Sequence, residues 1–144
     1  MTENAKKARE VFQSGSYTCV FCSGSSVVTS TERGLRPLLA LLDQGKTLHG
    51  YAAADKVVGK APAMLYVLLK ADSVYAPVMS RQALQVLQQN GIDASYDVLT
   101  DGIRNRAGTG SCPMEAAVQQ AETPQAALLA VRQAVASMQA AKKS

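Results

Sequence analysis

The sequence predicts an α/β fold, a three-layer α/β/α sandwich built on a five-stranded mixed sheet. Apolar runs of strand length alternate with segments of helical periodicity through the middle of the chain, and this order requires right-handed crossovers and a largely parallel sheet. Two β-prone runs near the amino terminus predict an antiparallel hairpin at one edge. The 144 residues fit one domain, 1–144, with the helix over 125–141 appended.

The first four elements follow from periodicity and turn residues. Residues 3–13 carry their apolar side chains on one helical face. The β-prone runs 17–22 and 26–30 are joined by the turn SGS, which predicts the hairpin. A helix over 37–44 starts with proline and is ended by Gly45.

The central elements alternate between strands and helices. The small, continuously apolar run 48–54 is typical of a buried strand. Apolar residues at helical spacing predict a helix over 57–70. Strands over 74–79 and 95–99 then flank a helix over 81–90.

Two prolines conflict with these elements, and a stripe marks the carboxyl-terminal helix. Pro62 lies inside 57–70, so this helix begins near Pro62 or has a distorted first turn. Pro77 predicts a bulge or an early end of its strand. The final helix repeats apolar residues at 3-4-3 spacing, a stripe that packs on the domain or on a second chain. The stripe comprises Leu128, Val131, Val135 and Met138.

Composition and charge exclude several classes of function. The net charge of +4 is scattered and only 5% of the residues are aromatic, so no nucleic-acid partner is expected. No apolar run approaches the about 18 residues of a membrane span, and the amino terminus lacks the apolar core of a secretion signal. Three cysteines, an odd number, fit a reducing compartment, so we expect a cytoplasmic protein.

The cysteine pair Cys19 and Cys22 has the C-x-x-C spacing of redox and metal motifs. On a strand, residues three apart point to opposite faces. The pair is therefore expected to pack in the core. His49 is the single histidine, which excludes sites built on paired imidazoles.

Ligands of open α/β sheets bind at the carboxyl ends of the strands. This rule directs attention to Ala54-Asp55-Lys56 and to 100–115. Asp55 either caps the next helix or supplies a carboxylate, with Lys56 as a neighbouring ammonium group. We assign both residues to the catalytic set, together with Cys112.

Cys112 precedes Pro113 and stands three residues before Glu115, which predicts that it is the N-cap of a helix. Backbone amides and the helix dipole would then favour the thiolate, the form of a nucleophile or sulfur carrier. Glu115 opposes this, because it completes a capping arrangement and its charge disfavours the thiolate. An inert buried cap is the alternative.

The glycine-rich loop before Cys112 offers successive backbone amides and two arginines, a cradle for phosphate or carboxylate. It matches neither the Walker loop nor the dinucleotide fingerprint, and an ordinary connector is the alternative. The residues predicted to bind a ligand are Arg104, Asn105, Arg106, Gly108, Gly110, Ser111, Glu115, Lys60 and Arg33.

Four segments carry a family resemblance: GLRPLLALL, YAAADKVVGKAPAMLYVLL, VYAPVMSRQAL and IRNRAGTGSCPME. Together they resemble a bacterial family of unknown function with a cytidine-deaminase-like fold, from about Tyr17 to Glu115. ADKVVGKA and NRAGTGSCPME are the most specific parts. The resemblance implies the same α/β/α sandwich and no established activity.

Zinc deaminases carry H-x-E or C-x-E at the start of one helix and P-C-x-x-C at the start of a later one. This chain has Ala54-Asp55-Lys56 and Cys112-Pro113-Met114-Glu115 there, without imidazole or a second thiolate. Zinc-dependent deamination is therefore not expected, and no metal or other cofactor is predicted.

The sequence thus predicts a zinc-free crevice that binds a small anionic metabolite or nucleotide. Catalysis through Cys112 stays open. A non-catalytic ligand sensor, or a subunit of a homo-oligomer or other assembly, is the alternative, suggested by the stripe on the final helix.

Overall fold

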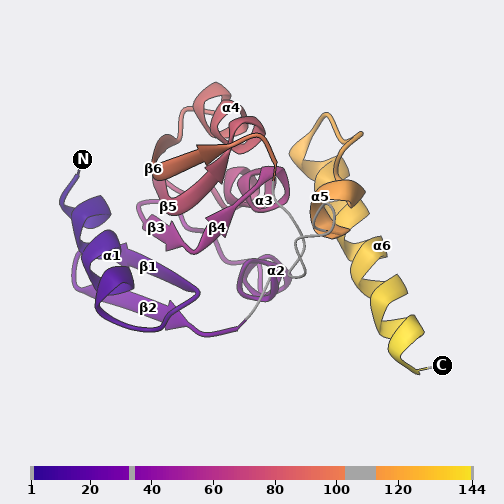
Figure 1. Cartoon of the computed structure of the whole chain (residues 1–144). Coiled ribbons are helices and arrows are strands. Elements are labelled where there is room, and N and C mark those ends of the chain that lie inside the picture. The colour runs from indigo at the N-terminus through magenta and orange to yellow at the C-terminus, as the bar shows by residue number, and fades with distance from the viewer. Residues whose placement is uncertain (1, 33–34, 103–112, 144) are drawn as a thin grey trace.

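The computed structural model of the chain describes residues 2–32, 35–102 and 113–143, with side chains up to residue 137 (Figure 1). The elements in chain order are α1 (Glu3–Ser14), β1 (Cys19–Ser23), β2 (Ser26–Ser30), α2 (Arg36–Asp43), β3 (Ala52–Asp55), β4 (Val57–Val58), α3 (Lys60–Leu69), β5 (Ser73–Ser80), α4 (Arg81–Gln89), β6 (Asp93–Thr100), α5 (Pro113–Ala117) and α6 (Pro124–Lys143). No helix in the described part of the chain is long and apolar enough to cross a membrane.

The strands form one mixed sheet. β1 runs antiparallel to both β2 and β3, whereas β3, β4 and β6 run parallel to β5. β6 pairs with β5 from one end to the other, so β3 and β4 share the opposite edge of β5, in a common register. The two short strands are one interrupted strand. When β3 and β4 are counted as one strand, the sheet has five strands, and the predicted five-stranded mixed sheet is confirmed.

Helices cover both faces of the sheet (Figure 1). α1 packs on one face through small side chains such as Ala5 and Ala8, which contact residues of β1, β3 and β5. The larger core lies on the other face, where α2, α3 and α4 bury Leu38, Leu65 and Leu87. α5 and α6 pack against α3. The predicted α/β/α layering is confirmed.

Pro62 lies in the first turn of its helix, and Pro77 lies in a strand of continuous register. α3 begins at Lys60, so Pro62 occupies its third position, where no intrahelical acceptor would be available for its missing N–H. The helical start at residue 57 is wrong, because Val57 and Val58 pair with β5 instead, and the alternative that the helix begins near Pro62 is confirmed. The predicted bulge or early end at Pro77 is also wrong, since β5 continues to Ser80 and Pro77 stands level with the interruption between β3 and β4.

Cys19 and Cys22 are both buried on β1, in core clusters on opposite faces of the sheet. Their predicted role in strand packing is confirmed. The predicted strand over 48–54 is shorter than expected and begins at Ala52, because Leu48 and Gly50 belong to a turn.

The apolar stripe of α6 packs on its own chain. Val131 is fully buried against α3 and α5, and Leu128 and Val135 are half-buried beside it. The fourth member, Met138, lies outside the described side chains. Of the two fates expected for the stripe, the described part shows packing on the domain.

Candidate functional site

Asp55 is the last residue of β3, at the carboxyl end of a parallel strand. Its Oδ2 accepts a hydrogen bond of 2.7 Å from the hydroxyl group of Tyr66, a fully buried residue of α3. Cys19 stands directly opposite Asp55 in the β1–β3 register. A carboxyl, a phenol and a thiol therefore meet where β1, β3 and α3 join.

All three groups have shifted pKa values because burial disfavours their charged forms; Cys19 and Tyr66 are buried and Asp55 is half-buried. Burial raises the pKa of Asp55 to about 7, although the Tyr66 hydroxyl and the Lys56 amide donate hydrogen bonds that lower it. Burial and the neighbouring Asp55 carboxylate raise the pKa of Cys19 to about 12. Burial and Asp55 also raise the pKa of Tyr66 well above its usual value. At neutral pH, Asp55 alone of the three exchanges its proton.

Lys56 follows Asp55, but among the ion pairs of the described residues there is none between their side chains. Its backbone amide donates to the carbonyl of Thr18 at 3.0 Å, and its side chain is exposed. The predicted capping role of Asp55 is wrong, since α3 begins at Lys60 with Gly59 as its N-cap. The carboxyl group of Asp55 bonds to Tyr66 instead.

Glu115 caps a different helix from the one predicted. Its two carboxylate oxygens accept hydrogen bonds from the backbone amides of Lys60, at 2.6 Å, and Ala61, at 2.8 Å. Burial raises the pKa of Glu115, although these bonds and the Lys60 side chain act in the opposite direction. Glu115 thus connects α5 to the amino terminus of α3, whereas the predicted N-cap Cys112 lies outside the described residues.

Gly59 makes this contact possible. A Cβ built at Gly59 would overlap the carboxylate group of Glu115. The glycine therefore lets the side chain of α5 reach the first free amides of α3, which point along the helix axis and attract negative charge.

Lys60 lies beyond this contact. Its ammonium group donates to the carbonyl of Gln119 at 3.2 Å and lines a pocket between α3, α4 and the connection from α5 to α6. Two of the predicted site residues are in contact in the described structure: the backbone amide of Lys60 donates to the side chain of Glu115. A third, Asp55, is bonded to Tyr66, which was not predicted.

The other predicted site residues lie outside the described residues. They are Arg33, Arg104, Asn105, Arg106, Gly108, Gly110, Ser111 and Cys112. Before this interval the last described residue is Gly102, and after it the first is Pro113. Thr100, just before this interval, pairs with Ser80 at the carboxyl end of β5. Among the described residues, no group of three or more histidine, cysteine or acidic side chains is arranged to hold a metal ion.

Tyr66 and Cys19 were missed by the sequence reasoning. Tyr66 has no polar neighbour in its own helix, and its partner Asp55 lies in a different element. Only the pairing register of β1 with β3 would have found Cys19. A tyrosine inside an otherwise apolar helix was the one available signal, because a buried hydroxyl group needs a partner.

A family model described as "Domain of unknown function (DUF1893)" matches residues 7–135. The chain belongs to the DUF1893 family. Among solved structures, it is similar to the crystal structure of a DUF1893 family protein from Thermotoga maritima, with 28% identity and a TM-score of 0.82. The similarity covers 95% of this chain and 92% of that chain. No curated protein matches the chain.

The family match confirms the expected membership of a family of unknown function. The likeness of this DUF1893 protein to cytidine deaminases stays a prediction.

Proposed function

We propose that this DUF1893 protein binds a small anionic metabolite or nucleotide at the carboxyl ends of β3 and β4, beside Asp55 and Lys56. The carboxyl group of Asp55 carries the proposal, since it is half-buried and bonded to Tyr66 at the edge of the sheet where α/β proteins bind ligands. Strongly perturbed carboxyl groups concentrate at functional sites.

The protonation state of Asp55 favours an anion. With a pKa of about 7, the carboxyl group holds a proton about half of the time at neutral pH. The protonated group donates a hydrogen bond to an anionic oxygen, whereas an ordinary carboxylate would repel it. The exposed ammonium group of Lys56 adds positive charge at the next residue.

As an enzyme, the protein would use Asp55 as a general acid or base and Cys112 as a nucleophile or sulfur carrier. The bonds from Glu115 to the start of α3 support this combination, because they hold α5 next to the helix that follows β4. Cys112 directly precedes α5 in the sequence. The proposed ligand contacts remain Arg33, Arg104, Asn105, Arg106, Gly108, Gly110 and Ser111.

Calorimetric titration of the full chain with sulfate and with a nucleoside monophosphate, at pH 6 and pH 8, tests the proposal. We expect tighter binding at pH 6, because Asp55 is then mostly protonated. Asp55→Asn should remove this pH dependence for sulfate, whose charge is constant over this range. Lys56→Met should weaken binding at both pH values, with Lys46→Met, an exposed lysine elsewhere, as the control.

The proposal is contradicted if neither probe binds at millimolar concentration at either pH. Cys112→Ser separates the enzyme from the non-catalytic sensor. If the protein is a sensor, this variant keeps its affinity for the probes. The pH dependence of alkylation of the wild-type Cys112 thiol then gives the pKa of free cysteine, about 8.5. An enzyme shows a thiol pKa clearly below that value.

A further inference from the structure

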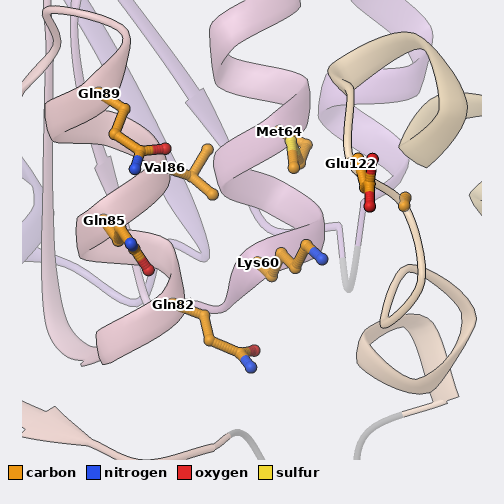
Figure 2. A pocket seen from close by; sticks show the side chains of 8 residues that line it. Lys60, Met64, Gln82, Gln85, Val86, Gln89 and Glu122 are labelled. Carbon is orange, nitrogen blue, oxygen red and sulfur yellow. The ribbon is translucent and has the colours of Figure 1, made fainter.

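A second pocket lies away from Asp55, between α3, α4 and the connection that joins α5 to α6. Its volume is about 340 Å³, within the range of small-molecule sites. In Figure 2, α4 bounds one side and Glu122 the other, with Met64 and Lys60 of α3 between them. The residues discussed below all line this pocket.

The floor of the pocket is apolar and belongs to the core. Met64 and Ala121 are buried, and Val86 is half-buried against them. These side chains are held by the packing of α3 against α5 and α6. The floor therefore offers a preformed apolar contact to a ligand.

One wall carries three amides. Gln82, Gln85 and Gln89 follow one another at helical spacing on α4, so they share a face. All three are exposed, and none has a side-chain hydrogen bond to another described residue. Each amide offers two donors and an acceptor.

Two opposite charges complete the pocket without neutralising each other. Lys60 gives one of its three N–H groups to the carbonyl of Gln119. Glu122 is exposed, and the ion pairs of the described residues include none between Lys60 and Glu122. One cationic and one anionic group thus face the same small volume.

We propose that this pocket binds a free amino acid, with its carboxylate on Lys60, its ammonium group on Glu122 and its side chain over Met64 towards the glutamines. A zwitterion satisfies both charges, and each contact is a charge-assisted hydrogen bond. A nucleotide fits less well, because no aromatic side chain lines the pocket to stack a base and Glu122 repels phosphate. This proposal is independent of the site at Asp55.

Titration of the full-length, isotopically labelled protein with each of the twenty amino acids, followed by NMR, tests the proposal. We expect saturable shifts of the methyl groups of Met64 and Val86 with at least one amino acid. The N-acetyl derivative and the carboxamide of that amino acid should each bind at least about tenfold more weakly, since each lacks one charge.

Lys60→Met and Glu122→Gln should each weaken the binding of the same amino acid by at least about tenfold. Gln85→Ala tests whether the glutamine amides of α4 contribute to binding. Gln88→Ala is its control, because Gln88 lies on α4 outside the pocket lining. The proposal is overturned if no amino acid shifts these methyl groups at 10 mM, about the weakest affinity worth assigning. It is also overturned if the blocked derivatives bind as well as the free amino acid, a result that needs no variant to fold.

Discussion

The carboxylate of Glu115 accepts a hydrogen bond of 2.6 Å from the backbone amide of Lys60, and so closes the amino terminus of α3 from outside that helix. The second oxygen of Glu115 accepts from the amide of Ala61. The N-cap residue itself, Gly59, has no side chain to serve these amides. A residue of α5 therefore performs the capping of α3, which couples the stability of α3 to the docking of α5.

Gly59→Ala should destabilise the protein, because the new methyl group overlaps the Glu115 carboxylate. We expect a loss of about 2 kcal/mol in the free energy of unfolding, made of displaced capping bonds and local strain. Chemical denaturation measures it. At Gly102, a Cβ meets no atom of the described residues within 4 Å, so Gly102→Ala is the control and should change stability little.

Glu115→Ala alone should cost about 1 to 2 kcal/mol, since the two amides of α3 lose their charged acceptor. The double variant with Gly59→Ala should lose less than the sum of the two single losses, because the overlap no longer exists. Additive losses would show that Gly59 and Glu115 do not meet in solution.

Tyr75 links α1 to β6 on the other face of the sheet. Its hydroxyl donates to Asp97 at 2.6 Å, and the guanidinium of Arg9 lies 4.7 Å over its ring centroid. Tyr75→Phe keeps the ring and removes the bond to the carboxylate, so we expect a loss of about 1 to 2 kcal/mol in denaturation. Tyr96→Phe, at a tyrosine that is 40% exposed, should be neutral. Equal effects of the two variants would exclude a role for the Tyr75–Asp97 bond.

Asp55 should make the protein less stable as the pH rises. Its pKa is about 7 in the folded chain and about 3.9 in an unfolded one, so the folded state holds the proton more tightly. The stabilisation is full below about pH 4 and is lost as the pH passes 7. From pH 4 to pH 8, wild type should lose up to about 4 kcal/mol relative to Asp55→Asn. Parallel stability curves for the two proteins would contradict this expectation.

The order of elements was predictable from the sequence because it rests on periodicity. The hairpin was predicted from its turn sequence around Gly24, which has a positive φ, and the strands of the parallel part other than β4 were also predicted. The apolar pattern starts the helix three residues before Lys60, because Val57 and Val58 are apolar in either assignment, and only Pro62 indicated the later start. Pairing with β5, a long-range property, decides between them.

The candidate site was predictable only in part, for the same reason. The rule for strand ends identified Asp55, but its bond to Tyr66 depends on how α3 lies over β3. Glu115 was recognised as a capping residue, yet the local sequence cannot show which helix it caps. Both contacts are tertiary, and neither leaves a fixed spacing in the sequence.

The most direct measurement is the pKa of the Asp55 carboxyl group. The chemical shift of its carboxyl carbon is followed by carbon-detected NMR from pH 3 to pH 9, in wild type and in Tyr66→Phe. We predict a value near 7 in wild type, and a higher value in Tyr66→Phe, because the tyrosine hydroxyl stabilises the charged form. A wild-type value near 4 would mean that solvent reaches the carboxyl group freely, and the proposed proton-exchanging anion site would be wrong.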